Sequence, residues 1–336
     1  MTPQEFLAMF APVAGNEARA AFLVNYFAER GTPAEVDGVG NVIVGEGPLA
    51  LAAHIDTVLE PAPLVVEEER WWGPAIGDNS SGVAVLATAW ERPPAEVTLV
   101  FPVGEEGLGN LEGARAYMAD HEPEAFVAVD GYLGGVVSRA LGSRRLQVEF
   151  RGPGGHSWGD RTVPNPAFAL GRLIQAVERL PAGEKQSRSV ARVWGGGAIN
   201  AIPREVGLTL DLRAVEEELL EKAEARVRQA AMEAAAAVGV EAAQQVLGRR
   251  PAGATATPEL LDCARQAALA AGFEPKFSAG STDMAAAVEK GVPAVTLGVY
   301  RGGGAHTAAE WVDPLSLDTG RALLINFFEC WRANRG

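Results

Sequence analysis

The sequence describes an acidic globular protein of 336 residues, of which 48% are hydrophobic and 21% charged. This composition excludes a disordered or fibrous chain, and the length predicts about two domains with a sizeable core. The formal net charge of −14 argues against nucleic acid or an anionic membrane as a partner, because either would be repelled, and it favours binding of divalent cations.

The chain carries no recognisable targeting signal. Its amino-terminal residues lack a basic segment followed by an apolar core, and no apolar run approaches 18 residues. We therefore expect a cytoplasmic protein with no membrane partner. Cys263 and Cys330 lie in apolar helical patterns without a Cys-x-x-Cys spacing, and we interpret them as buried free thiols.

The first part of the chain alternates between helices and strands. A helix is predicted from Asn16 until shortly before Gly31, followed by a strand pair within 36–44 and a buried strand from Leu49. Further helices are predicted at 82–89 and 114–120, and further strands at 95–103 and 125–129. This alternation predicts an α/β sheet with its site at the carboxyl ends of the strands.

The pattern of polar and apolar residues changes near Gly142. Strands of alternating polarity are expected at 144–150, 187–194, 205–213 and 241–247, with helices at 164–180 and 216–238. This order predicts a small two-layer α+β domain, ferredoxin-like, over 143–251, inserted between residues 1–142 and 252–336 of the first domain. After 258 the α/β pattern returns, with a strand at 294–299 and a closing helix to Trp331.

Acidic and imidazole groups follow the strands of the first domain. In His54-x-Asp56, strand alternation places both side chains on one face, so that the carboxylate can accept one ring N–H and leave the other nitrogen free for a metal. Asp78 lies in Gly-Asp-Asn-Ser-Ser-Gly, and Glu106, Asp130 and His306 occupy further strand ends or loops.

Together, two imidazoles and three carboxylates can hold two cations with three ligands each, provided that one carboxylate is shared. This donor set suits zinc, with cobalt or manganese as alternatives. Glu105 precedes Glu106 in a loop flanked by glycines, where one glutamate can be a ligand and the other a general base. An isolated pair of this kind is more often a solvated acidic turn.

The ordered motifs resemble the M20 metallopeptidase family, which includes peptidase T, carboxypeptidase G2, aminoacylases and succinyl-diaminopimelate desuccinylases. The resemblance covers almost the whole chain. It rests on the motifs around His54, Asp78, Glu106 and Asp130, on Gly154-Gly155-His156-Ser157 in the insert, and on a late Gly-x-x-His306-Thr.

The resemblance implies a zinc-exopeptidase-like α/β/α catalytic domain with two zinc ions. His54, Asp78 and Asp130 would hold one ion, and Asp78, Glu106 and His306 the other. Asp56 would orient His54, and Glu105 would be the general base and later the proton donor. A cis peptide bond is implied between Asp78 and Asn79.

The insert resembles the lid of this family, which also pairs two subunits, and therefore implies a homodimer. There His156 would assist the oxyanion, while Asn200 and Arg213 would bind the substrate. Taken without the resemblance, His156 is more often a surface residue and Arg213, after Asp211, a structural ion pair.

Three functions remain open. The first is an exopeptidase of small peptides similar to a tripeptide aminopeptidase, which Asp130 and Asp78-Asn79 favour within the resemblance. The second is an N-acyl amino acid deacylase or carboxypeptidase. The third is a non-catalytic binding protein, against which the intact ligand set and Glu105 argue. Trp71 and Trp72 could line the mouth of the site or form a packed edge.

Overall fold

The computed structural model describes residues 1–335, which form two compact units. The first unit joins residues 1–140 to the segment from Ala254 onward, and the second unit is Leu141–Gly253. Each boundary lies two residues outside the inserted segment that the sequence predicts. Among the described residues, no helix has the length and apolar character needed to cross a membrane.

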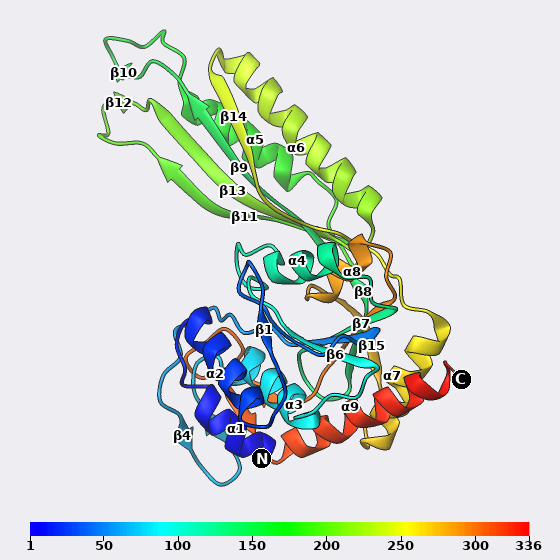
Figure 1. The fold of residues 1–336 in the computed structure, drawn as a ribbon. Coiled ribbons are helices and arrows are strands. Elements are labelled where there is room, and N and C mark those ends of the chain that lie inside the picture. The colour runs from blue at the N-terminus through cyan, green and yellow to red at the C-terminus, as the bar shows by residue number, and fades with distance from the viewer. Residues whose placement is uncertain (336) are drawn as a thin grey trace. The chain divides into compact units, whose positions relative to one another are not determined.

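The first unit is built on an eight-stranded sheet in the order β1-β2-β6-β3-β7-β16-β8-β15 (Figure 1). Its strands are β1 (Glu35–Val36), β2 (Val42–Val44), β3 (Leu49–Ala52), β6 (Val97–Phe101), β7 (Ala125–Val129), β8 (Gly135–Ala140), β15 (Lys276–Gly280) and β16 (Ala294–Leu297). The central strands β6, β3, β7 and β16 run parallel to their neighbours within this group, so their carboxyl ends meet at one edge. Every residue of these four strands is buried, as expected for a parallel sheet covered on both faces.

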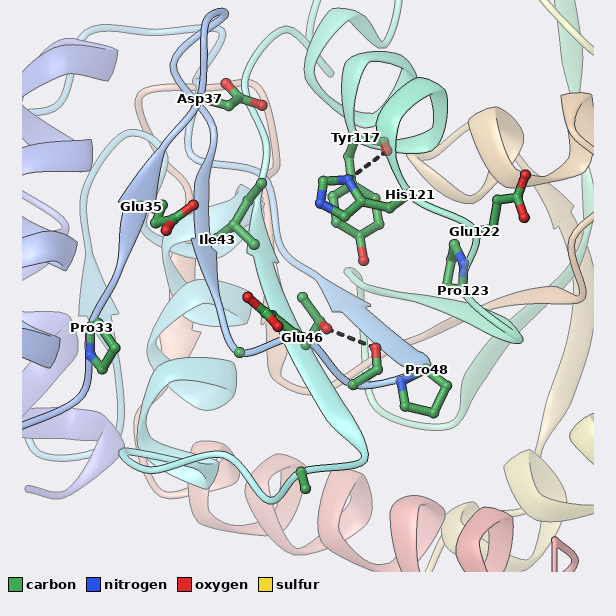
Figure 2. A pocket seen from close by; sticks show the side chains of 14 residues that line it. Pro33, Glu35, Asp37, Ile43, Glu46, Pro48, Tyr117, His121, Glu122 and Pro123 are labelled. Atoms are coloured by element: carbon green, nitrogen blue, oxygen red, sulfur yellow. Dashed lines mark hydrogen bonds between the residues drawn. The ribbon is translucent and has the colours of Figure 1, made fainter.

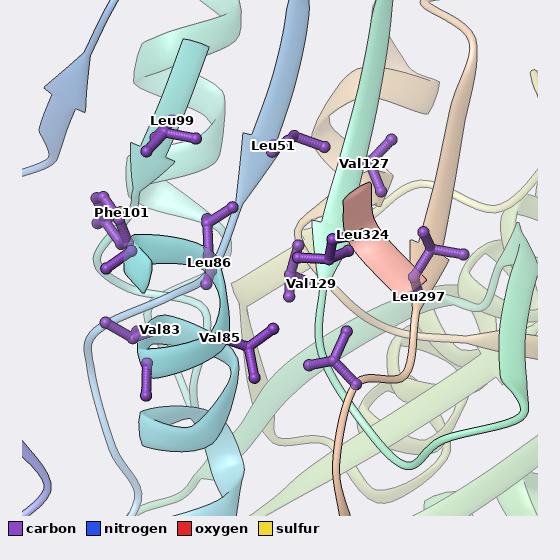
Figure 3. Packing of buried hydrophobic residues seen from close by; sticks show 14 of the residues in the cluster. Leu51, Val83, Val85, Leu86, Leu99, Phe101, Val127, Val129, Leu297 and Leu324 are labelled. Atoms are coloured by element: carbon purple, nitrogen blue, oxygen red, sulfur yellow. The ribbon is translucent and has the colours of Figure 1, made fainter. Parts of the chain in front are cut away.

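Helices cover both faces of this sheet. They are α1 (Pro3–Phe10), α2 (Asn16–Ala28), α3 (Gly82–Ala89), α4 (Glu112–Asp120), α7 (Pro258–Ala270), α8 (Met284–Glu289) and α9 (Ser316–Ala333). Figure 3 shows one core, in which Leu86 of α3 and Leu324 of α9 pack with Leu51 and Val127 of the strands. The alternate strand residues, such as Phe126, belong to a second core with α4 and α8. Because successive side chains of a strand point to opposite faces of the sheet, the same strands contribute residues to the cores on both faces.

A small antiparallel sheet in the order β17-β18-β5-β4 lies in the same unit. Its strands are β4 (Val65–Val66), β5 (Trp71–Trp72), β17 (Arg301–Gly303) and β18 (Trp311–Asp313). Trp72 pairs with Trp311, with ring centroids 6.1 Å apart, and both tryptophans of β5 are half-buried. This sheet joins two segments that are far apart in sequence, one leading to Asp78 and the other enclosing His306.

The second unit contains a four-stranded antiparallel sheet in the order β11-β13-β9-β14. Its elements are β9 (Gly142–Arg151), α5 (Pro166–Glu178), β11 (Gln186–Gly195), β13 (Glu205–Ala214), α6 (Glu217–Val238) and β14 (Glu241–Arg250), together with the short pair β10 (Gly155–His156) and β12 (Ala201–Ile202). A separate apolar core joins the sheet to α5 and α6. The main elements follow the β-α-β-β-α-β order expected from the sequence.

One expectation is wrong. Cys263 and Cys330 form a disulfide bond and are not free thiols. Helices α7 and α9 pack against each other, and this packing brings the two Cα atoms to 5.5 Å, within the range that a disulfide spans. The two residues are 67 positions apart, so no local pattern signals their pairing.

Candidate metal centre

The carboxyl ends of three parallel strands carry the residues expected in the site. His54 follows β3, Glu105 and Glu106 follow β6, and Asp130 follows β7. Because these strands are parallel neighbours, their ends lie along one edge of the sheet. Asp78 reaches the same place from the turn of Ile76–Ser81, and His306 from the loop between β17 and β18.

Asp78 is the centre of the cluster. The Nε2 atom of His54 lies 3.1 Å from its Oδ1, and the Nε2 atom of His306 lies 3.0 Å from its Oδ2. His306 Nε2 is also 3.1 Å from Glu106 Oε1. Ligand atoms of His54, Asp78 and Glu106 all lie within 4.8 Å of one another. One carboxylate therefore presents an imidazole to each of its oxygens, which is the arrangement expected of a bridging ligand.

Asp56 contacts the ring of His54 through both its backbone and its side chain. The Nδ1 atom of His54 lies 3.1 Å from the carbonyl oxygen of Asp56 and 3.5 Å from its carboxylate. The carboxylate accepts hydrogen bonds from the backbone N–H groups of Glu105, at 3.1 Å, and Glu106, at 2.8 Å. Asp56 thus holds the imidazole through its backbone and the glutamate loop through its side chain, leaving Nε2 of His54 toward Asp78.

The site concentrates negative charge in a buried place. Burial and the neighbouring charge of Asp78 raise the pKa of Asp130 to about 7, and the same two causes raise the pKa of Glu106. Burial lowers the pKa of His54, but the adjacent carboxylates of Asp56 and Asp78 outweigh it and raise this pKa well above its usual value. Such mutual repulsion among carboxylates is relieved by a bound cation.

The donor atoms fit a divalent cation. Nε2 of His54 and Oδ1 of Asp78 are buried, face each other and form no hydrogen bond to any group in the part of the chain described. Buried polar atoms without partners are rare in native proteins, and a coordinated ion satisfies both of these. Nitrogen and oxygen donors without thiolate match zinc, cobalt or manganese.

The loop of Asp78 is packed closely. The peptide bond between Asp78 and Asn79 is cis, as the family resemblance implied. The side chain of Asn79 donates to the carbonyl oxygen of Val129 at 2.9 Å. A Cβ atom at Gly82 would lie 2.1 Å from Asn79 Oδ1, so only glycine fits there.

Two residues that the sequence patterns did not single out support this loop. Arg19 is 1% exposed and donates to the carbonyl oxygen of Ile55 and to Ser80 Oγ, which places it between the His54 strand and the Asp78 loop. Glu310 is 2% exposed and accepts the backbone N–H of Asp78 at 2.8 Å. Its only signal in the sequence is its position four residues after His306.

The second unit brings two of its three expected site residues together. His156 in β10 is exposed, and its Nε2 lies 3.5 Å from Nδ2 of Asn200. Arg213 bonds to Asp211 at 2.7 Å and lies near the far end of β13. Its neighbour on β9 is Ser143, whereas the β10–β12 pair lies beyond Arg151 at the other end of the sheet.

A cavity of about 1040 Å³ lies at the opposite ends of the strands of the first sheet from the metal site (Figure 2). Its lining includes Pro48, just before β3, and Pro123, just before β7, so it opens at the amino ends of these strands. The ring of His121 stacks on Tyr117 beside it. None of the residues expected in the metal site lines this cavity.

A parallel α/β core with carboxylates and imidazoles converging at the strand ends defines a candidate metal-binding enzyme. The chain belongs to the peptidase family M20/M25/M40, whose model matches residues 50–329. It is thus an M20 family hydrolase, and the resemblance seen in the sequence is confirmed.

Curated relatives are similar to parts of the chain. A putative [LysW]-lysine/[LysW]-ornithine hydrolase from Pyrococcus abyssi is 34% identical over 40% of this chain and 43% of its own length. A [LysW]-lysine hydrolase from Deinococcus radiodurans is 32% identical over 54% of this chain and 52% of its own length. The chain therefore matches about half the length, or less, of these two relatives.

Solved structures share the fold over nearly the full length. Aminopeptidase PepT from Bacillus cereus superposes with a TM-score of 0.81 at 20% identity, covering 97% of this chain and 98% of that one. The YXEP protein from Bacillus subtilis, described as a dinuclear metal-binding peptidase of the M20 family, gives a TM-score of 0.71 at 18% identity, covering 97% and 96%.

Proposed function

We propose that the protein is a two-metal hydrolase of the amide bond in small peptides or N-acylated amino acids. The observation that carries this proposal is the carboxylate of Asp78, with one imidazole at each oxygen. One cation would be held by His54, Asp78 and Asp130, and the other by Asp78, Glu106 and His306. Zinc is the proposed metal, and when bound it would polarise the scissile carbonyl.

Glu105 is the proposed general base. It is 6% exposed, and its backbone N–H is fixed by Asp56 at the end of β6, beside the ligand Glu106. It would take a proton from the attacking water as the oxygen–carbon bond forms. It would then pass this proton to the leaving nitrogen as the carbon–nitrogen bond breaks.

For the substrate, we favour an amide of a basic amino acid. The relatives matched over 40% and 54% of this chain are named hydrolases of [LysW]-lysine or [LysW]-ornithine. Their names favour the deacylase type of activity over the tripeptide aminopeptidase that we placed first from the sequence. The aminopeptidase is kept as the second candidate because Asp130 and Asp78-Asn79 follow the peptidase pattern.

We also propose a homodimer formed through the second unit, which would act as a lid. Strands β9 and β13 each have ten residues, about 30 Å in length. The chain enters and leaves this unit at the end where Gly142 and Arg250 lie, whereas His156 and Asn200 lie beyond the opposite end. This separation supports action of His156 on the site of a partner.

The surface around His156 also supports a partner. Trp158 is 76% exposed, and Ile199, next to Asn200, is fully exposed. Strand β11 is an edge of its sheet. Exposed apolar side chains and a strand edge that pairs on one side only are both typical of a surface that a second subunit covers.

The substrate proposal is tested with two sets of amides. Protein reconstituted with zinc, cobalt or manganese is assayed on Nα-acyl-lysine and Nα-acyl-ornithine, and on a tripeptide with a free or acetylated amino end. We expect release of the basic amino acid to have the highest kcat/KM. A preference for the free tripeptide, abolished by acetylation, would instead establish the aminopeptidase. Glu105→Gln protein purified in parallel controls for contaminating peptidases.

A further inference from the structure

Glu310 has a buried carboxylate that is hydrogen-bonded to the backbone of another loop. It directly precedes β18, and its Oε1 accepts the backbone N–H of Asp78 at 2.8 Å. In addition, the carbonyl oxygen of Glu310 accepts the N–H of Gly73 at 3.0 Å. Glu310 therefore holds the segment from Gly73 to Asp78 at both of its ends.

Gly77 makes room for this carboxylate. A Cβ atom built there would lie 2.6 Å from Glu310 Oε1 and 3.0 Å from atoms of the Tyr300 ring. The backbone of Gly77 does not have a positive φ angle, so the constraint on this position is space and not conformation. The contact between Glu310 and the Asp78 loop can thus be disturbed from either side.

Glu310 also belongs to the segment that carries His306. The loop between β17 and β18 contains both residues, four positions apart. His306 and Asp78 approach to 3.0 Å, although 228 positions separate them. A contact that fixes these two loops against each other therefore sets the distance between the two side chains.

We infer that Glu310 is a positioning residue that aligns the Asp78 loop with the His306 loop, so that one Asp78 oxygen faces each imidazole. This inference rests on the proposed two-metal function. Backbone N–H groups bond more strongly to a carboxylate than to a neutral acceptor, and glutamine offers only one acceptor oxygen. Loss of this alignment should mainly lower the affinity for the cation held by Asp78, Glu106 and His306.

The test uses Glu310→Gln and Gly77→Ala, with Glu69→Gln, an exposed glutamate before β5, as the matched control. Metal-free proteins are titrated with Co²⁺ by calorimetry and visible absorption. We expect wild type and the control to bind two ions per chain. Both test variants should bind the ion held by Asp78, Glu106 and His306 about 10- to 100-fold more weakly, which is the range found when groups that orient metal ligands are removed. The cobalt spectrum of both variants should also change. At saturating metal, kcat should fall with KM changed less than about threefold.

The outcomes separate the inference from the proposed function. If wild type does not bind two ions, the two-metal function fails. If wild type binds two ions and both variants match it in affinity, spectrum and kcat, Glu310 has no positioning role. Circular dichroism and thermal unfolding show whether each variant folds. Loss of folding in both variants, or a lowered melting temperature with an unchanged cobalt spectrum, would make Glu310 a stability residue only and would overturn the inference.

Discussion

Arg19 offers the sharpest test of how the first unit holds its site. It lies in α2 with 1% of its surface exposed, and its guanidinium donates at 2.8 Å to the carbonyl oxygen of Val13, at 2.9 Å to that of Ile55 and at 2.8 Å to Ser80 Oγ. Burial lowers its pKa to about 10, against the opposing charge of Asp56, so it remains charged at neutral pH. Ile55 lies between His54 and Asp56, and Ser80 is two residues after Asp78.

Arg19→Met keeps much of the length of the side chain and removes all of its donors. Each hydrogen bond from a charged donor contributes about 1.5–3 kcal/mol, so the three short bonds together give an upper range of about 5–9 kcal/mol. The variant no longer buries a charge, which offsets part of this loss. We therefore expect the free energy of unfolding to fall by about 3–5 kcal/mol, with a decrease in melting temperature on the order of 10 °C.

Thermal unfolding of metal-free protein measures this effect without a contribution from metal binding. Arg92→Met is the control, because Arg92 is exposed and, within residues 1–335, donates one hydrogen bond, to the carbonyl oxygen of Arg30. It should change stability by less than about 1 kcal/mol. If Arg19→Met were as mild as this control, the buried hydrogen bonds of Arg19 would not hold the strand end to the Asp78 loop.

Four other predictions concern the metals, the general base, the dimer and the stability of the folded protein at acid pH. Asp78→Ala should lose both metal ions in metal analysis, and one tightly retained ion would exclude a bridging role. Glu105→Gln should keep its metals and lower kcat by about 10²-fold or more, whereas Glu106→Gln should lose metal affinity; the reverse pattern would exchange the two roles. Mixing Glu105→Ala and His156→Ala subunits should restore about a quarter of wild-type activity if His156 acts on the partner, and none if it acts on its own subunit. Burial raises the pKa of Glu91, but bonds from Arg30, Tyr26 and the amino terminus outweigh it and lower this pKa from 4.5 to about 2. A lowered pKa stabilises the folded state above pH 4.5, so the advantage of wild type over Glu91→Gln in thermal unfolding should disappear as the pH falls toward 2.

Local sequence patterns were sufficient for many of the elements and for the strand ends that carry the expected site residues, but they did not predict α1, β8 or β15. The run of buried residues before His54 and the apolar residues of 125–129 predict strands that the structure contains. Alternating polarity in the insert predicts its antiparallel sheet, because one face of that sheet packs on helices and the other does not. Residues at the carboxyl ends of parallel strands must lie at one edge, so the order of the motifs already indicated a shared site.

Contacts between distant segments were decided only by the tertiary structure. Cys263 and Cys330 have the apolar surroundings of buried thiols, and only the packing of α7 on α9 makes them a disulfide. Asn200 and Arg213 are 13 residues apart, yet the hydrogen-bond register places them near opposite ends of one sheet.

The sequence by itself determined which residues could bind metal, because strand periodicity and chain order are local properties. The tertiary structure alone decided what holds them. Glu310 meets Asp78 across 232 positions, and Arg19 meets Ser80 across 61. A buried charge of this kind must be hydrogen-bonded to the polar groups that surround it, and the folded chain, not the neighbouring sequence, assembles those groups.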